Sequence, residues 1–144
     1  MTQEMQIAAA QEHFGALIAT ELERIAHMKE SQETLDFSKL DTIVVGILPG
    51  DGVGPLLMVQ ALRVLKKLLE PELANGKIEL RTIEGMTIEN RAALEESLPQ
   101  SVLDACRQCH VLIKGPFVTP RPGDPWPNLP SANSLLRRNL ELFA

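Results

Sequence analysis

Three groups of residues in this 144-residue sequence have types and spacings that could do chemistry. The segment Gly50–Pro55 reads GDGVGP and is rich in glycine. Ser131, Asn133 and Arg137 bring a hydroxyl, an amide and a guanidinium close together in the chain, and Cys106 and Cys109 have the spacing C-x-x-C. Each group has a binding or redox interpretation and a plain structural one, and the elements around it help to choose between them.

The glycine-rich segment follows an apolar run and precedes a helical pattern. Backbone N–H groups at such a strand-to-helix turn, together with the helix dipole, favour an anion. The spacing is neither G-x-G-x-x-G nor a Walker A loop, because the third glycine comes too early and no Gly-Lys-Ser/Thr follows. A tight turn that needs glycine at unusual dihedral angles explains the same residues at least as well.

Ser131, Asn133 and Arg137 have the spacing Ser-x-Asn-x-x-x-Arg at the predicted start of a helix. Because Arg137 follows Asn133 by four residues, both side chains can face one ligand. A guanidinium makes bidentate contacts with a carboxylate, and the serine and the amide add neutral hydrogen bonds. The spacing is therefore compatible with a carboxylate-binding site. From the residues alone, a solvated helix arginine is our interpretation of Arg138 and also the favoured one for Arg137.

The cysteine pair has a spacing that occurs in redox sites and in half of a zinc site. No second cysteine pair is present to complete a zinc site, and His110 alone does not do so. Cys106 falls on the apolar face of a predicted helix. We therefore interpret Cys106 and Cys109 as structural residues.

The composition argues against several classes of function. With a net charge of -5 and no run of Lys or Arg, the chain has no basic surface that would attract nucleic acid. No apolar run approaches the roughly 20 residues that cross a bilayer, and no basic start precedes an apolar run, so we expect a cytoplasmic protein without a membrane partner. The chain contains no tyrosine. A mechanism that needs a phenol as acid must take it from elsewhere.

Apolar periodicity predicts an α/β domain behind an N-terminal helix. Helical spacing runs from Ile7 to Ile25 and a polar linker follows at 29–34, so we divide the chain into an extension at 1–38 and a domain at 39–144. The N-terminal helix is interpreted as a structural cap, with docking or dimer support as the alternative. Strands are predicted at 42–48, 77–83 and 110–114.

The helices predicted between and after these strands complete an alternating pattern. They are a largely buried helix at 54–69 closed by Pro71, a helix that starts near Ser97 to Pro99 and buries Val102, Leu103 and Cys106, and a closing helix at 134–143. The segment 115–130 is rich in proline and glycine, and loops this long are either binding elements or disordered. The order is typical of a three-layer α/β/α fold with a partly parallel sheet.

From Ile43 to Ala144 the order of these motifs resembles the opening part of the isocitrate/isopropylmalate dehydrogenase family. The family's Gly-Asp-Gly-Ile-Gly-Pro turn is matched at Gly50–Pro55, its strand-to-loop segment at 112–116 with Thr119 and Pro120, and its isocitrate-type Ser-x-Asn-x-x-x-Arg at 131–137. Leu56 departs from the usual glutamate. The segment 126–130 resembles isopropylmalate-type members. The resemblance therefore implies an incomplete fold of this family that mixes features of both branches.

The resemblance also implies a reaction. Members oxidise and decarboxylate a 2-hydroxy acid with NAD or NADP and Mg²⁺ or Mn²⁺. It assigns substrate binding to Ser131, Asn133 and Arg137, and places Thr119 near the nicotinamide or the substrate, as a cofactor-binding residue. The family's metal-binding aspartates, lysine and tyrosine lie beyond the matched part, so no catalytic residue and no metal ligand is assigned.

We therefore expect an N-terminal part of such an oxidoreductase that is inactive alone and forms a homodimer or is complemented by a C-terminal part. One alternative is a non-catalytic regulatory or binding subunit that pairs with a full-length dehydrogenase chain and docks through the N-terminal helix. Another is an unrelated phosphate-binding α/β module. The substrate stays open: Ser131 and Asn133 favour isocitrate, whereas the segment around Trp126 favours isopropylmalate or another 2-hydroxy acid.

Overall fold

The computed structural model describes residues 2–30 and 35–142, and the chain divides into two units between Asp36 and Phe37. In the first unit, helix α1 spans Gln3–Glu30. The predicted helix therefore exists and is longer than its apolar pattern. Its six largest apolar side chains are 45–64% exposed: Ile7, Phe14, Leu17, Ile18, Leu22 and Ile25. The predicted linker at 29–34 begins inside α1, and its residues 31–34 lie outside the described residues.

The second unit is built on a three-stranded parallel sheet with the strand order β2-β1-β3. The strands are β1 (Ile43–Leu48), β2 (Ile78–Thr82) and β3 (Val111–Lys114). The central strand β1 pairs with both neighbours in parallel. Its β-branched apolar sequence fits this position, because a central strand of a parallel sheet is covered on both faces. The predicted partly parallel sheet is confirmed, and the three strands described are all parallel.

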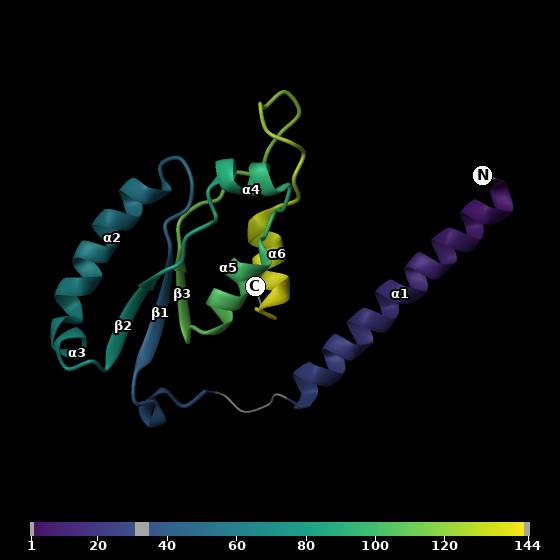
Figure 1. Cartoon of the computed structure of the whole chain (residues 1–144). Helices are drawn as coiled ribbons and strands as arrows, with labels where there is room; N and C mark the ends of the chain where they lie inside the picture. Colours follow the sequence, from purple (N-terminus) through teal and green to yellow (C-terminus); the bar gives the residue numbers. More distant parts are fainter. Residues whose placement is uncertain (1, 31–34, 143–144) are drawn as a thin grey trace. The chain divides into compact units, whose positions relative to one another are not determined.

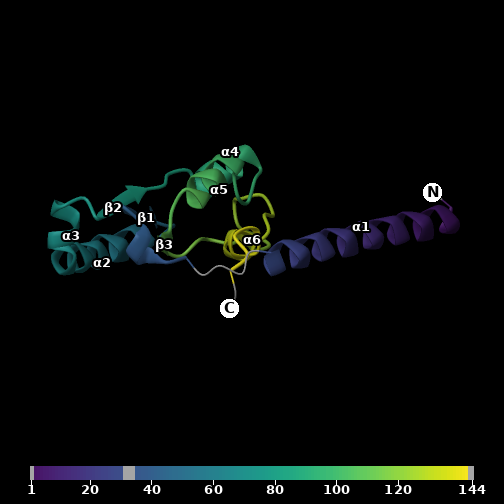
Figure 2. The ribbon, with the colours of Figure 1, turned by 90° about the horizontal axis from the view of Figure 1, so that it is seen from below.

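Helices cover the two faces of this sheet. They are α2 (Gly54–Leu68), α3 (Glu70–Ala74), α4 (Ile88–Leu94), α5 (Gln100–Arg107) and α6 (Ala132–Asn139), and a short 3-10 helix precedes β1 at Phe37–Lys39. Figure 1 shows α2 and α3 on one side of the sheet and α5 and α6 on the other, and the view from below in Figure 2 shows the same separation. The α/β fold with an N-terminal helix is confirmed.

Alternate residues of β1 enter two separate hydrophobic clusters. Val45 and Ile47 pack with Met58 of α2 on one face of the sheet. Leu48 belongs to the cluster on the opposite face, together with residues of α5 and α6. In α5 the buried residues are the three that the periodicity predicts: Val102, Leu103 and Cys106.

The prediction that the helix at 54–69 is largely buried is wrong. In α2 only Gly54 and Met58 are buried, whereas Leu56, Val64 and Leu68 are 71%, 61% and 72% exposed. The physical reason is that only one stripe of α2 faces the sheet, so its remaining apolar residues point away from the strands. The side of α2 that faces away from the sheet, here called the outer side of α2, therefore exposes the apolar residues Leu56, Val64 and Leu68.

Several helix boundaries also differ from the prediction. Pro71 does not close a helix but lies in the first turn of α3. Proline is tolerated there because the backbone N–H groups of a first turn have no partner within the helix. Helix α5 begins at Gln100 with Pro99 as N-cap, and the Ser97 hydroxyl makes no cap hydrogen bond. Helix α6 begins at Ala132, two residues earlier than predicted. Helix α4 was not predicted; its N-cap is Thr87, whose hydroxyl accepts from the backbone N–H of Asn90.

None of the helices in residues 2–30 and 35–142 combines the length and apolar character needed to cross a membrane.

Candidate functional site

The carboxyl ends of the three strands bring the chemically interesting loops to one edge of the sheet. Because the strands are parallel, the segments after β1, β2 and β3 all leave from this edge. The strand order places β2 and β3 on opposite sides of β1. The connections therefore diverge next to β1, which is where open α/β sheets commonly bind ligands.

The glycines of the first loop serve close packing against the loop after β3. Gly50 has a φ of +86°, and a Cβ atom there would lie 2.4 Å from the carbonyl oxygen of Pro116. A Cβ atom on Gly115 would lie 2.1 Å from the carbonyl oxygen of Pro49. The N–H of Asp51 donates to the Pro116 carbonyl at 2.7 Å. This contact of backbone with backbone accounts for Gly50 and Gly115, and it supports the tight-turn explanation over an anion site.

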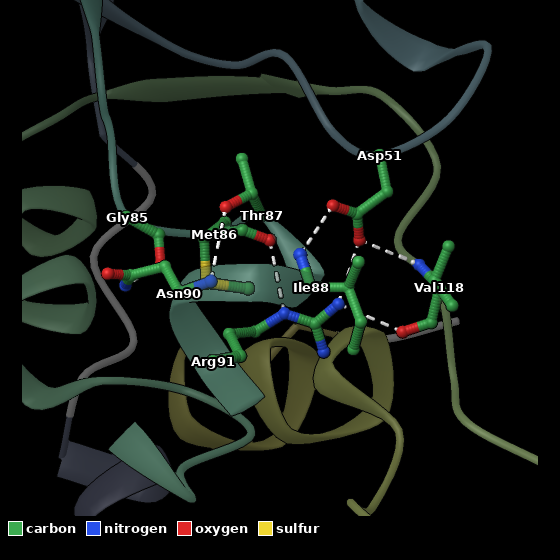
Figure 3. Close-up of polar contacts among 8 residues, drawn as sticks. All are labelled: Asp51, Gly85, Met86, Thr87, Ile88, Asn90, Arg91 and Val118. Carbon is green, nitrogen blue, oxygen red and sulfur yellow. Dashed lines mark hydrogen bonds and ion pairs between the residues drawn. The ribbon is translucent and has the colours of Figure 1, made fainter. Parts of the chain in front are cut away.

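Asp51 connects three segments through its two carboxylate oxygens. Oδ1 accepts from the backbone N–H of Ile88 at 2.7 Å, and Oδ2 accepts from Nη2 of Arg91 at 2.8 Å and from the N–H of Val118 at 2.9 Å. Figure 3 shows these three donors arranged around the carboxylate. Asp51 therefore fastens the turn after β1 to α4 and to the loop after β3.

Arg91 completes this cluster from α4. Its Nε donates to the carbonyl of Met86 at 3.1 Å, and its Nη2 donates to the carbonyl of Val118 at 2.9 Å as well as to Asp51 (Figure 3). The Cζ atom lies 6.0 Å from the centre of the Phe117 ring. Both backbone polar groups of Val118 are thus held, the N–H by Asp51 and the carbonyl by Arg91.

The ion pair is buried. The side chains of Arg91 and Asp51 are 0% and 3% exposed. Burial of a single charge is costly, and a partner with additional hydrogen bonds offsets that cost. The Nη1 atom of Arg91 is buried and has no hydrogen-bond partner among the described residues. No charge-pair pattern in the sequence points to Arg91; the apolar Ile88 three residues earlier is the indication that both could share an inward face of a helix.

The predicted substrate-binding residues lie together at the start of α6. Ser131 is the N-cap, and its hydroxyl accepts from the N–H of Ser134 at 3.4 Å. Asn133 and Arg137 are half-buried and lie one helical turn apart. Within the part of the chain that the structure describes, no ion pair engages the guanidinium of Arg137. The geometry leaves these three residues able to face one ligand, and their role in binding stays a prediction.

Thr119, the predicted cofactor-binding residue, comes from a different segment. It is exposed and directly follows Val118. Phe117 packs against the hydrophobic cluster that contains Ala132 and Leu136, so the loop after β3 lies against α6. Among the described residues, no hydrogen bond joins Thr119 to Ser131, Asn133 or Arg137.

The described residues do not by themselves fit a divalent cation or a dinucleotide. No group of three or more His, Cys, Asp or Glu side chains in residues 2–30 and 35–142 could hold a metal ion. The Asp51 carboxylate is occupied by three donors, and Asp124 accepts from the N–H of Arg121 at 2.8 Å. In dinucleotide-binding loops, glycines allow the pyrophosphate to approach the backbone closely. Here Gly50 and Gly115 are instead packed against the backbone carbonyls of Pro116 and Pro49. We therefore assign no chemical step to a bound metal or cofactor.

The two cysteines are held in their thiol form. Burial, together with the neighbouring Cys109, raises the pKa of Cys106 to about 11. Burial also raises the pKa of Cys109, against the opposing effect of Arg81. A thiol with a raised pKa is a poor nucleophile and a poor metal ligand, which supports a structural role.

Comparison with known proteins agrees with this arrangement. Residues 44–144 match the isocitrate/isopropylmalate dehydrogenase family. The 3-isopropylmalate dehydrogenase of Vibrio vulnificus (strain YJ016) is 30% identical over 109 residues, which cover 71% of this chain and 28% of that protein. The enzyme of the same name from Heyndrickxia coagulans is 33% identical over 106 residues, and that from Rhodopirellula baltica is 35% identical over 100 residues.

These two alignments cover 69% and 68% of this chain and 27% of each relative. The chain thus spans little more than a quarter of the length of the dehydrogenases it matches. No solved structure gave a significant match. The match nevertheless covers the sheet from the second residue of β1 onward and both loops joined by Asp51, and the chain belongs to the isocitrate/isopropylmalate dehydrogenase family.

Proposed function

We propose that this chain is the N-terminal, substrate-binding part of an oxidoreductase that oxidises and decarboxylates a 2-hydroxy acid, isocitrate or an isopropylmalate-like compound. The reaction would use NAD or NADP and Mg²⁺ or Mn²⁺, both bound mainly by residues outside this chain. Membership of a dehydrogenase family supports the reaction class. The arrangement of Ser131, Asn133 and Arg137 on α6 is the observation that carries the binding role.

Arg137 has the chemistry and the placement for a ligand carboxylate. Its guanidinium presents several donors in a fixed plane and is half-buried, so a carboxylate bound there would be partly shielded from water. Asn133 lies one turn away and can add neutral hydrogen bonds. The Ser131 hydroxyl accepts one bond as N-cap and can still donate one to a ligand.

A binding titration tests this role. Isothermal titration of the chain with isocitrate and with 3-isopropylmalate should show binding of at least one ligand. We expect Arg137→Gln to weaken it about tenfold or more, the size of one lost charge-assisted contact. Arg138→Gln is the matched control, because Arg138 is the neighbouring exposed arginine. Absence of binding by the unsubstituted chain, or equal loss in the two variants, would contradict the proposal.

Turnover by this chain alone is not expected. The reaction requires a metal to polarise the hydroxyl and groups that move protons, and the described residues contain no cluster for a metal. An assay with isocitrate, 3-isopropylmalate or tartrate, NAD(P) and Mg²⁺ should therefore show no product. Clear turnover by the purified 144-residue protein would overturn this part of the proposal.

A second candidate function is a non-catalytic regulatory or binding subunit that pairs with a full-length dehydrogenase chain. The outer side of α2 supports it, because an exposed apolar surface of this kind is typical of a contact with another protein segment. A shallow groove of about 590 Å³ runs along it, lined by Gln60, Arg63, Val64, Lys67 and Leu68.

Mixing experiments separate the two candidates. A catalytic part should gain activity only when a separate C-terminal part of a dehydrogenase is added. A regulatory subunit should instead change the KM or kcat of a full-length enzyme that is already active. Each outcome is measured by NAD(P)H absorbance. Val64→Glu on α2 should abolish the effect on a full-length enzyme, because α2 carries the surface proposed for that contact.

A further inference from the structure

We propose that Asp51 and Arg91 are positioning residues that fix the backbone at Thr119, the residue we expect beside the cofactor or substrate. For ligand affinity this inference rests on the proposed function. For the conformation of the loop it rests on the hydrogen bonds alone. Neither residue touches a ligand in this scheme, so both act through the segment that they hold.

The first step of the argument is the double contact at Val118. Asp51 accepts from its N–H at 2.9 Å, and Arg91 donates to its carbonyl at 2.9 Å (Figure 3). A residue whose two backbone polar groups are both held by buried charged side chains has little freedom in either neighbouring peptide plane. Thr119 shares the second of these planes.

The second step is the residue on the other side of Thr119. Pro120 is buried, and its ring fixes its own φ. The residue before a proline is itself restricted to extended conformations, because the ring crowds its backbone. Thr119 is therefore an exposed residue held between two anchored neighbours, which is the arrangement expected for a side chain that must be presented to a ligand at a fixed place.

The third step concerns the origin of the anchor. Arg91 is tied to the carbonyl of Met86, and Asp51 is tied to the N–H of Ile88. These hydrogen bonds fix the position of the loop after β3 relative to α4 and to the turn after β1. The three segments meet at the carboxyl edge of the sheet. The hydrogen bonds that satisfy the two buried charges therefore also fix both backbone groups of Val118, and with them the loop that carries Thr119.

The substitution Arg91→Lys tests the anchor while keeping the charge. A single ammonium cannot reproduce the planar fork that reaches Met86, Asp51 and Val118 together. Asp51→Asn is the second variant, which keeps the shape and one acceptor oxygen. Arg107→Lys is the matched control, because Arg107 pairs with Asp104 at 3.5 Å on an exposed helix surface.

The first readout is amide hydrogen exchange by NMR on the full chain. In the unsubstituted protein the Val118 amide should be protected to a degree similar to the β1 amide of Val45. In Arg91→Lys and Asp51→Asn we expect exchange at Val118 to accelerate about tenfold or more beyond any acceleration at Val45, which reports the loss of global stability, and we expect the resonance of Thr119 to shift. Arg107→Lys should leave all three unchanged.

The second readout is the affinity for isocitrate or 3-isopropylmalate, which should fall about tenfold in both variants. An unprotected Val118 amide in the unsubstituted protein, or unchanged exchange in a folded Arg91→Lys, overturns the inference. Faster exchange at Val118 with unchanged affinity overturns its functional half. If the unsubstituted chain binds neither acid, the proposed function fails, and the exchange data alone decide whether the pair fixes the loop.

Discussion

Arg91 and Asp51 lie 40 residues apart in the chain and form an ion pair of 2.8 Å between Nη2 and Oδ2, with 0% and 3% of their side chains exposed. The pair joins the first turns of α4 to the loop after β1. Since both charges are out of water, removal of one leaves the other uncompensated, whereas removal of both leaves no isolated charge. The two residues should therefore be strongly coupled in stability.

The first prediction is a coupling energy for this pair. Arg91→Met should lower the free energy of unfolding by about 3–5 kcal/mol, because the Asp51 carboxylate stays buried without its cation. Asp51→Asn should have a smaller cost, since the amide oxygen can still accept from a backbone N–H. In the double variant the cost should be smaller than the sum of the two by about 1 kcal/mol or more. Urea unfolding of the four proteins measures this cycle.

The exposed pair Arg107 and Asp104 is the control for this cycle. Its coupling should stay below about 1 kcal/mol, because water screens both charges. Strictly additive costs for Arg91 and Asp51 would contradict the interpretation that the ion pair acts as one unit.

The second prediction concerns the contact between the two glycine-containing loops. Gly115→Ala would place a Cβ atom 2.1 Å from the carbonyl oxygen of Pro49, so the loops must separate, at a cost of about 3 kcal/mol in unfolding free energy. Gly52→Ala is the comparison. Gly52 has a φ of +57° but nothing within 4 Å of an added Cβ atom, and its substitution should cost only about 1 kcal/mol. Equal costs in thermal or urea unfolding would show that the close approach does not hold in solution.

Apolar periodicity was sufficient to predict the three strands and the presence of helices α2, α5 and α6. The β-branched run of β1 and the buried residues of α5 follow directly from the pattern, because burial on a fixed face imposes a fixed period. The same pattern overestimated the burial of α2. An apolar stripe indicates that a helix face is suited to burial, but it does not show whether residues of the same chain cover that face. Leu68 lies on such a stripe of α2 and is 72% exposed.

The candidate site also has one part that could be predicted from the sequence and one that could not. Ser131, Asn133 and Arg137 are close in the chain, so their spacing on a helix was readable. The Arg91 cluster was not, because its contacts join loops that meet only after the three strands pair, and a lone arginine in a short helical segment indicates a solvated surface. Helix α4 itself was missed, since seven residues carry too little periodicity to stand out.

The third prediction is a loss of stability in alkali that depends on Cys106. Burial raises the pKa of this thiol to about 11 from an ordinary value of 9.0, so the folded chain holds the proton more tightly than the unfolded chain. The resulting stabilisation is complete below about pH 9 and is lost as the pH rises toward about 11. The free energy of unfolding in urea should fall across this window.

The matched variant for this experiment is Cys106→Ala, which costs stability at every pH by leaving a cavity but removes the titrating group. The difference in unfolding free energy between the two proteins should shrink as the pH rises through the window. No tyrosine is present to titrate there, and Cys109, whose pKa is also raised by burial, is present in both proteins. A difference that is independent of pH would show that the thiol is not protected by burial.

The fourth prediction distinguishes the two sides of α2. Met58 is 6% exposed and packs with Val45 and Ile47, so Met58→Ala should lower the free energy of unfolding by about 2–5 kcal/mol. Val64 is 61% exposed, and Val64→Glu should change it by no more than about 0.5 kcal/mol. Urea unfolding of dilute protein measures both values.

The same variant tests the outer side of α2 as a contact surface. If this surface binds another protein segment, Val64→Glu should abolish that association, as judged by sedimentation, without loss of stability in dilute solution. Lys66→Glu is the control, because Lys66 is exposed on the same helix but does not line the groove that Val64 and Lys67 share. A large stability loss for Val64→Glu would mean that the side chain is covered in solution by this chain itself. Equal loss of association in the two variants would point to net charge, and not to the apolar groove, as the cause.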